Sequence, residues 1–408
     1  MLVYIHIKDA HSRARRILYM TYQLIAPTAF GLEAVTAREL TNLGFADVHT
    51  EDGRVFFTGD ADGVARANLW LRTAARVQIC LAKFRAVTFE ELFQGVKAIP
   101  WGDWLPEDAR FPVDGRSVKS TLFSISDCQA IAKKAVVEKL KLKYGRDFFE
   151  ETGALYRLEV SLLRDVVTVT LDTTGAGLHK RGYRKIAGEA PLKETMAAAL
   201  IDLTYWKPGR LLVDPMCGTG TIPIEAALIA ENRAPGLTRT FVSEQWSDFA
   251  PAFARAREEA KDLIRPCGEI TLFGGDIDAK AVDVAQTCAR LAGVDSAVRF
   301  ERRDMRSYTS AEKFGFLVTN PPYGERLGEA EEVAELYRAL GKVYRGLDSW
   351  SCYVITAHPE FERLFGKRAD KRRKLFNGRL PCQYYQYFGP KPPRAPRADT
   401  AEKEGDSK

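Results

Sequence analysis

The tetrapeptide Asn320-Pro321-Pro322-Tyr323 combines residue types that could activate an exocyclic amino group of a nucleobase as a nucleophile. Such an amine attacks poorly because its lone pair is delocalised into the ring. The side-chain oxygen of Asn320 and the carbonyl oxygen of Pro321 could accept the two amine hydrogens and localise the lone pair as charge develops. Two prolines stiffen this backbone, and Tyr323 could stack on a base that has left its own stack. The motif therefore predicts methylation of a base amine, and no general base is needed before the transfer because the proton becomes acidic afterwards.

A second motif, from Asp214 to Gly220, joins an apolar strand to a helix. We expect the strand at 211–213 and the helix at 222–230, and Gly218 and Gly220 would let the backbone approach a ligand closely. Dinucleotide-binding loops use three glycines to seat a pyrophosphate, whereas this loop has two and places Asp214 at the strand end. A carboxylate there would repel a phosphate and pair with an ammonium. S-adenosylmethionine carries an ammonium and a sulfonium but no phosphate, so the loop favours it as the cofactor.

Further acids follow later strands in the order that a nucleoside cofactor would require. Asp276 ends the second expected strand, where a carboxylate usually accepts hydrogen bonds from ribose hydroxyls, and Ile277 could cover a face of the adenine. Asp276 is preferred to Asp278 on the phase of the strand alone. Asp304 follows the third strand and could accept a hydrogen bond from the adenine amino group. Together these residues complete the predicted cofactor site.

Strands that alternate with helices must position these residues. Five apolar runs are expected to form the strands, at 211–213, 270–273, 298–301, 316–319 and 352–355. This alternation is typical of a doubly wound parallel sheet. Nearer the end, Asn377-Gly378 lies between the runs 374–376 and 380–388, which predicts an antiparallel hairpin with a type I′ turn. The carboxyl-terminal half is therefore expected to be an α/β, class I methyltransferase domain.

The first half of the chain has a different pattern, typical of small α+β layers. Its expected elements are a strand at 22–26, a helix at 32–43, a strand at 55–57, a helix and strand within 70–80, a strand at 119–124, a helix at 128–142 and a hairpin of 158–163 with 166–171. A loop rich in glycine and cationic residues, 175–190, would link this half to the catalytic half.

Length and composition limit the class of protein. The 408 residues exceed one ordinary core and predict two or three domains. No apolar run reaches about 18 residues, so a membrane span is excluded. The seven cysteines form no CxxC pair and no Cys/His cluster, which predicts a reducing, cytoplasmic compartment and no metal site. Because Met20 opens a more convincing strand, residues 1–19 are expected to be either a disordered extension or a stretch that is not translated.

Positive charge concentrates at the carboxyl-terminal end, although the net charge of the chain is only +6. Residues 366–408 hold twelve Lys or Arg against five Asp or Glu, which suits a polyanionic partner. A solubilising tail and a solvated lysine-bearing helix remain alternatives to RNA contact. His179 receives no role as a base because Lys180 and Arg181 beside it indicate an RNA-contacting loop. The predicted RNA contacts are Lys119, Lys133, Lys134, Lys180, Arg181, Arg184, Lys371, Arg372 and Arg373.

With these residues in place, the chain from about 22 to 393 resembles the THUMP-domain methyltransferases, in particular the short form of the bacterial large-subunit rRNA guanine-N2 methyltransferase L group. Both motifs above carry the resemblance, together with the strings 84–93, 118–120, 127–131, 171–175 and 178–184. The resemblance implies RNA as partner, with guanine N2 in 23S rRNA or a large-subunit precursor as target. It also implies a ferredoxin-like segment at 20–80, a THUMP RNA-binding domain at 81–175 and a Rossmann-like class I methyltransferase domain at 191–390. Composition adds the linker at 176–190 and predicts a disordered tail at 391–408. Long family members carry a second methyltransferase half, so dual activity is not expected here.

Three other functions stay open. Closely similar modules act on guanine in tRNA. A DNA adenine or cytosine amino-methyltransferase shares both motifs, but it needs a domain that reads a major groove, and fewer than ninety residues follow Tyr323. An RNA-binding assembly factor could keep the methyltransferase fold as a scaffold. The sequence gives neither the target nucleotide nor the oligomeric state.

Overall fold

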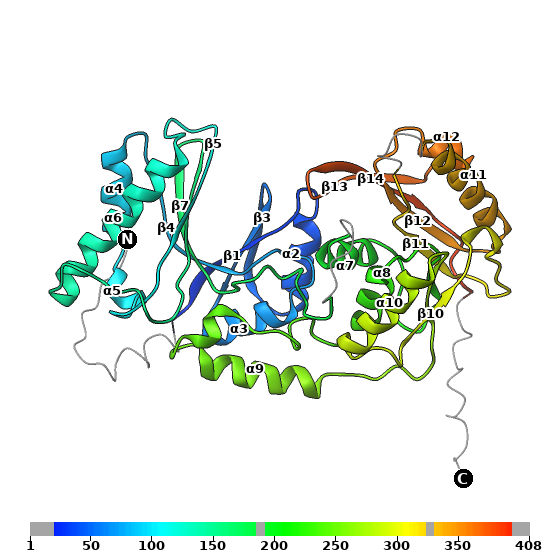
Figure 1. Ribbon diagram of the computed structural model, residues 1–408, viewed down its shortest axis with the longest axis horizontal. Helices are drawn as coiled ribbons and strands as arrows, with labels where there is room; N and C mark the ends of the chain where they lie inside the picture. Colours follow the sequence, from blue (N-terminus) through cyan, green and yellow to red (C-terminus); the bar gives the residue numbers. More distant parts are fainter. Residues whose placement is uncertain (1–19, 185–191, 324–329, 394–408) are drawn as a thin grey trace, which may run out of the picture.

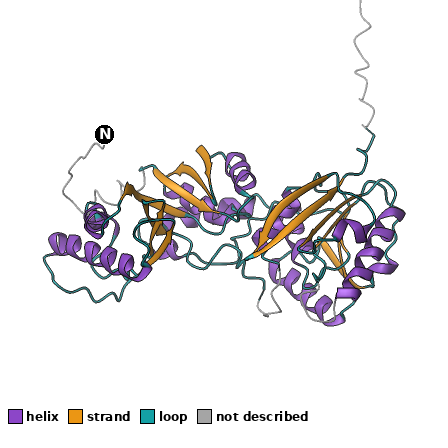
Figure 2. Cartoon of the chain, turned by 90° about the horizontal axis from the view of Figure 1, so that it is seen from above, coloured by secondary structure: helices purple, strands orange, loops and turns teal. Residues whose placement is uncertain are grey.

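The computed structural model describes residues 20–184, 192–323 and 330–393 and arranges them around two seven-stranded sheets. The sheets lie side by side along the longest axis of the molecule, each with its own helices (Figures 1 and 2). The first half contains β1 (Tyr22–Pro27), α2 (Glu33–Asn42), β2 (Ala46–Glu51), β3 (Arg54–Gly59), α3 (Ala61–Trp70), β4 (Gln78–Arg85), α4 (Phe89–Lys97), α5 (Trp101–Trp104), β5 (Val113–Val118), α6 (Ile125–Tyr144), β6 (Leu158–Leu163) and β7 (Val166–Asp172). The second half contains α7 (Glu194–Asp202), β8 (Leu212–Asp214), α8 (Thr221–Ala230), η1 (Val242–Gln245), α9 (Ala250–Asp262), β9 (Leu272–Asp276), α10 (Ala279–Ala292), β10 (Val298–Arg302), η2 (Met305–Ser307), β11 (Phe316–Thr319), α11 (Ala330–Gly346), β12 (Ser351–Thr356), α12 (Phe361–Phe365), β13 (Lys371–Asn377) and β14 (Leu380–Tyr387). None of the described helices is both long and apolar enough to cross a membrane.

The first sheet has the order β2-β3-β1-β4-β7-β6-β5. The predicted hairpin of β6 and β7 is confirmed, and its residues alternate as a half-buried strand requires. Leu158, Val160 and Leu162 are buried, whereas Glu159 and Ser161 are more accessible. Because β4 pairs with both β1 and β7, the two expected α+β layers form one continuous sheet.

The strand predicted at 119–124 is wrong, because β5 ends at Val118 and a loop follows. Lys119 has a φ of 50°, which breaks the extended backbone. The helix expected within 70–80 is also misplaced, since α3 already ends at Trp70. Neither difference was visible in the apolar pattern, because apolar residues continue past the true element ends.

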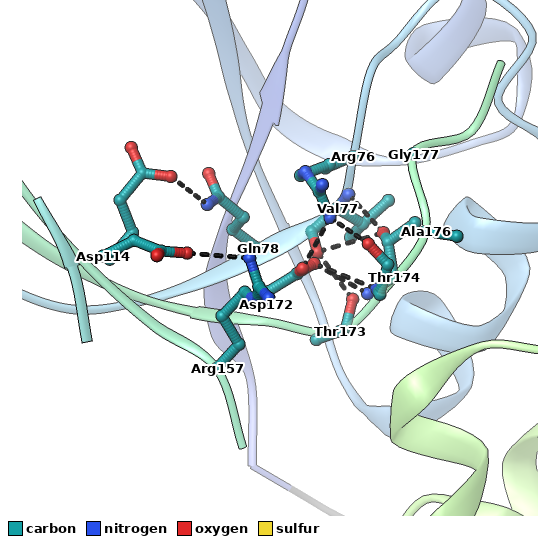
Figure 3. Close-up of polar contacts among 12 residues, drawn as sticks. Arg76, Val77, Gln78, Asp114, Arg157, Asp172, Thr173, Thr174, Ala176 and Gly177 are labelled. Atoms are coloured by element: carbon teal, nitrogen blue, oxygen red, sulfur yellow. Dashed lines mark hydrogen bonds and ion pairs between the residues drawn. The ribbon is translucent and has the colours of Figure 1, made fainter. Parts of the chain in front are cut away.

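A buried polar cluster fastens the end of β7 to the start of β4 (Figure 3). Arg76 Nη1 lies 2.6 Å from Asp172 Oδ2, and the backbone N–H of Thr174 donates to Asp172 Oδ1 at 2.9 Å. The hydroxyl of Thr173 donates to the carbonyl oxygen of Val77 at 2.7 Å. Burial raises the pKa of Asp172, an effect that Arg76 opposes. The string 171–175 therefore serves the architecture of the first half.

The second sheet has the order β10-β9-β8-β11-β12-β14-β13, with five parallel strands followed by an antiparallel hairpin. Residues of α7, α8 and α10 join the core on one face, and residues of α11 and α12 join the core on the other. The predicted doubly wound sheet is thus confirmed. The type I′ turn is wrong, because Asn377 pairs with Leu380 and only Gly378 of the turn has a positive φ, 65°.

The two halves share their cores. Leu32 and Val35 of the first half belong to the core of the second sheet. In the opposite direction, the segment between α8 and β9 leaves the second sheet, and α9 packs beneath α3 (Figure 1). Trp246 stacks on Tyr156, with ring centroids 4.5 Å apart. Part of the expected methyltransferase region therefore completes the hydrophobic core of the first half.

Candidate active site

The residues predicted to bind cofactor and perform chemistry meet at one edge of the second sheet. Asp214 ends β8 and Asp276 ends β9, while Asn320 directly follows β11. The strand order reverses between β8 and β11, and open α/β sheets bind ligands at such a switch point, beyond the carboxyl ends of the strands. The topology therefore brings the glycine loop beside the Asn-Pro-Pro-Tyr motif.

The loop after β8 turns at two glycines that differ in their surroundings. Gly218 and Gly220 have φ values of 52° and 80°. A Cβ atom on Gly220 would lie 2.7 Å from the Phe300 ring and 2.9 Å from the Ala285 Cβ, so packing as well as backbone geometry requires glycine. A Cβ atom on Gly218 would meet no described atom within 4 Å. Gly218 is thus the point where this backbone can approach a ligand.

Asp214 is a buried carboxyl group held by its neighbours. Its side chain is 2% exposed, and its Oδ1 accepts hydrogen bonds from Thr319 Oγ1 at 2.6 Å and from Met216 N at 3.2 Å. Burial, and to a smaller extent the charge of Asp276, raises the pKa of Asp214 to about 7. A cation placed beside the carboxylate would favour its ionised form. The group suits an ammonium ligand and disfavours a phosphate.

Asp276 and Asp278 have different roles. Asp276 Oδ2 accepts from Gly218 N at 2.8 Å, which ties β9 to the glycine loop, and its Oδ1 accepts from Asp278 N at 3.0 Å. Asp278 instead caps α10 by accepting from Lys280 N at 2.9 Å. Carboxylate oxygens have further lone pairs, so Asp276 can also accept from hydroxyl groups. Ile277, between them, is 59% exposed.

Asp304 lies at the same edge but already has partners. Arg303 N donates to the carbonyl oxygen of Asp276 at 2.9 Å, which keeps the ends of β9 and β10 together. The Asp304 carboxylate caps η2 through Arg306 N at 2.9 Å and pairs with Arg306 Nη1 at 3.3 Å. Its binding to adenine remains a prediction.

The Asn-Pro-Pro-Tyr motif adopts an arrangement that the sequence did not predict. The hydroxyl of Tyr323 donates to Asn320 Oδ1 at 2.5 Å, so it engages the oxygen expected to accept a substrate hydrogen. The Tyr323 ring packs against the core of the second sheet, with Cys382 Sγ 3.9 Å from its hydroxyl. This burial raises the pKa of Tyr323. A base could stack on the accessible part of this ring, or the ring could first leave this position and release Asn320.

Two residues that sequence reasoning missed support the motif from behind. The hydroxyl of Tyr337, on α11, donates to the carbonyl oxygen of Pro322 at 2.7 Å and lies 2.8 Å from Thr356 Oγ1 at the end of β12. Within the described part of the chain, no hydrogen bond reaches the carbonyl oxygen of Pro321. One indication of this support was present in the sequence, the polar residue Thr356 at the end of the fifth parallel strand.

Comparisons with known proteins identify three matching domain families. They are described as "RlmL ferredoxin-like domain" over residues 23–78, "THUMP domain" over 86–172 and "RMKL-like, methyltransferase domain" over 181–386. A Bacillus subtilis (strain 168) protein named "Putative RNA methyltransferase YpsC" is 48% identical over 383 residues, covering 93% of this chain and 99% of that protein. The chain belongs to the RMKL-like methyltransferase family.

Two further relatives add detail to this family assignment. The "Ribosomal RNA large subunit methyltransferase K/L" of Syntrophotalea carbinolica is 37% identical over 397 residues, covering 91% of this chain and 55% of that protein. This RMKL-like methyltransferase thus spans about half of that relative. The crystal structure of SMU.472 complexed with SAH has a TM-score of 0.86 and 43% identity, covering 91% of this chain and 99% of that one.

One predicted RNA contact of this methyltransferase is wrong. Arg181 is 2% exposed, and its Nη2 lies 3.3 Å from Glu225 Oε2, itself fully buried. Its guanidinium also donates to the carbonyl oxygens of Leu178 at 2.9 Å and Arg72 at 2.6 Å. The Arg181 side chain therefore enters the junction between the two halves and is not part of the surface. Burial and nearby cations lower the pKa of His179 to about 4, so this ring is neutral at pH 7.

Two more of the predicted RNA contacts, Lys133 and Arg184, form ion pairs with acidic residues of this chain. Lys133 pairs with Glu151 at 2.5 Å and lies 3.4 Å from the centroid of the Phe111 ring. Arg184 pairs with Glu194 at 3.2 Å and donates to the hydroxyl of Thr221. The sequence could not reveal these acidic partners because they lie on other elements.

The remaining predicted RNA contacts are more accessible. Lys119, Lys134, Lys180, Lys371 and Arg372 are exposed. Arg372 pairs with Glu362 at 2.5 Å, and Arg373, less exposed, donates to the carbonyl oxygen of Gly31 at 3.2 Å. The structure describes no cluster of three or more His, Cys, Asp or Glu residues that could hold a metal.

Proposed function

We propose that this chain transfers the methyl group of S-adenosylmethionine to an exocyclic amine of a base in RNA, namely N2 of a guanine in 23S rRNA. The observation that carries the proposal is the position of Asn320 to Tyr323 at the end of β11, next to the buried acid and glycine loop at the end of β8. A THUMP match over residues 86–172 and the names of the two relatives support RNA as the substrate.

The residues at this edge fit the cofactor. Asp214 would pair with its ammonium, Asp276 would accept from its ribose hydroxyls, Ile277 would cover its adenine and Asp304 would accept from the adenine amino group. Gly218 permits the close approach of the backbone. A relative's complex with SAH, the demethylated cofactor, supports the same assignment. The cofactor supplies an electrophilic methyl group on a sulfonium.

Asn320 and Pro321 would orient and activate the base amine. When Tyr323 releases Asn320, the Asn320 Oδ1 and the Pro321 carbonyl oxygen can accept the two amine hydrogens, and the Tyr323 ring becomes free to stack on the base. Held in this way, the amine nitrogen would be oriented to accept the methyl group that the bound cofactor would supply. The nitrogen then loses a proton to solvent. Tyr337 keeps the acceptors in place by holding the Pro322 carbonyl.

The substrate class can be tested by supplying radiolabelled S-adenosylmethionine with unmodified rRNA, tRNA or duplex DNA in separate reactions. We expect label in rRNA, recovered as N2-methylguanosine. Label confined to tRNA or to DNA would overturn the rRNA assignment. Cofactor binding without transfer to any nucleic acid, including large-subunit precursor particles, would favour the scaffold role of an assembly factor.

A further inference from the structure

The loop after β5 presents apolar side chains to solvent at one tip of the THUMP domain. Phe123 is 82% exposed, and Val118 and Ile125, which flank this loop, are each 44% exposed. Single exposed apolar residues are common, but several on one short loop mark an interaction surface. We call this loop and its flanks, residues 118–125, the β5 tip.

Hydrogen bonds hold the β5 tip in a defined conformation. Thr121 N donates to Asp165 Oδ1 at 2.7 Å, and Asp165 N donates to Ser120 Oγ at 3.0 Å. The hydroxyl of Ser117 donates to the carbonyl oxygen of Leu122 at 2.6 Å. Phe123 is thus presented by a fixed backbone, so the conformational entropy lost on binding would be small.

Exposed cations flank the β5 tip. Lys119 on the loop, Arg164 in the adjoining β6–β7 turn and Arg85 near Asp165 are exposed, and none of the three forms an ion pair with a described residue. The nearby acids are Asp165, whose Oδ1 accepts the backbone bond from Thr121, Asp127 on the first turn of α6, and Glu91 on α4. The charge of Arg85 acts on both Asp165 and Glu91. Lys119 and Arg164 thus lie near the Phe123 ring without a salt bridge to a described residue. This combination matches a nucleic acid strand, since bases stack on aromatic rings and cations bind phosphates.

The β5 tip also lies on the same side of the molecule as the catalytic edge. In Figure 1 the loop beside the β5 label and the β13–β14 hairpin both lie at the upper side, and Tyr323 contacts Cys382 of β14. The shared cores and the Arg181–Glu225 pair connect the two halves. One RNA could therefore reach both places on a connected scaffold.

We propose that the β5 tip binds a single-stranded segment of the RNA substrate, with an unpaired base stacked on Phe123 and phosphates contacted by Lys119 and Arg164. This inference rests on RNA being the partner under the proposed function. It adds a base-stacking contact that charge patterning alone did not reveal.

The test compares the affinities of full-length variants for two probes, single-stranded oligoadenylate of about 20 nucleotides and an RNA duplex of about the same length. We expect Phe123→Ala to weaken oligoadenylate binding by roughly tenfold and duplex binding by less than about twofold, because stacking needs an unpaired base. Phe123→Trp should restore oligoadenylate binding. Phe148→Ala is the matched control, since Phe148 is 77% exposed beyond the opposite end of α6.

Unchanged oligoadenylate binding by Phe123→Ala would overturn the inference, as would an equal loss with the duplex or with Phe148→Ala. Retained RNA binding with lost co-sedimentation on large-subunit particles would instead indicate a protein partner and also overturn it. The proposed function fails separately. If the enzyme methylated no guanine but Phe123 still governed oligoadenylate affinity, the stacking site would stand while the reaction assignment would fall.

Discussion

At the residue scale, Asn320 is the side chain on which the proposed chemistry most depends. Asn320→Ala removes one acceptor for the developing charge, and losing such a polar contact costs about 10²–10³ in kcat. We expect that loss in a single-turnover methylation assay. Affinity for S-adenosylmethionine, measured by calorimetry, should change by less than about twofold. Loss of cofactor binding equal to the loss of rate would assign Asn320 to the cofactor site instead.

The contributions of the Tyr323 ring and of its hydroxyl can be measured separately with two variants. Tyr323→Phe keeps the ring and removes the bond to Asn320 Oδ1, so base binding should be unchanged or tighter. Tyr323→Ala removes the stacking surface and should lower kcat/KM by roughly tenfold or more. Steady-state kinetics with both variants provide the measurement. An equal loss for Phe and Ala would show that the hydroxyl, and not the ring, contributes.

Asp214 gives cofactor binding a pH dependence. Its pKa of about 7 lies well above the ordinary value of 3.8, so the site holds a proton in mildly acidic solution. A cationic ligand prefers the ionised carboxylate, and this proton must leave first. Affinity for S-adenosylmethionine should fall by up to about tenfold per pH unit below pH 7 and level off above it. Calorimetry should show this slope in the wild type and not in Asp214→Asn, and the same slope in both would contradict the assignment.

At the scale of elements, the β8–α8 loop predicts different outcomes for its two glycines. Gly220→Ala would force a Cβ toward Phe300 and Ala285, so thermal unfolding should show a loss of roughly 1–3 kcal/mol. Gly218→Ala has open space and only the cost of positive φ, about 1 kcal/mol. Its added methyl group should instead weaken cofactor binding. Equal destabilisation with unchanged cofactor affinity would place the ligand elsewhere.

Elements whose ends are marked by neighbouring residues were predicted well, whereas elements whose ends depend on distant contacts were not. β11 was predicted at its observed bounds because three apolar residues and a β-branched threonine are followed by a polar Asn-Pro sequence. The 119–124 segment was mistaken for a strand because its stop signals, the φ of Lys119 and the bonds to Asp165, depend on a turn 44 residues away, as the Thr121–Asp165 bond shows. The order of the acids along the sheet edge proposed to bind the cofactor could be predicted from the order of the strands. The hydrogen bond between Tyr323 and Asn320 could not.

At the scale of the whole molecule, the buried Arg181–Glu225 pair lies at the junction between the first half of the chain and the second. Arg181→Met alone leaves Glu225 charged and unpaired, which costs roughly 3–5 kcal/mol. Arg181→Met combined with Glu225→Leu should recover part of this stability, because the buried carboxylate is removed together with its guanidinium partner. The Tyr183 hydroxyl then loses its acceptor, which limits the recovery. Thermal unfolding of the two single variants and the double variant measures the coupling. Additive losses would show that the pair does not act as a unit.

The joining of the halves was the least predictable feature. Arg181 resembled a surface cation because its partners come from α8 and from the carbonyl oxygens of distant loops. Trp246 and Phe253 lie in the catalytic half of the sequence, yet they pack in the core of the first half. The spacing of apolar residues along the chain does not show which core each of them joins. The kinds of domain could therefore be predicted from the sequence, whereas the sharing of their cores could not.

The most direct test of the proposed function is to locate the transferred methyl group. Unmodified rRNA would be incubated with S-adenosylmethionine bearing a deuterated methyl group, using wild-type protein and Asn320→Ala, and the nucleosides analysed by mass spectrometry. We predict a deuterated methyl group on N2 of guanosine with the wild type and at most about a hundredth of that rate with the variant. A label on a ring carbon, a ribose oxygen or adenine N6, or an equal rate for both proteins, would contradict the account.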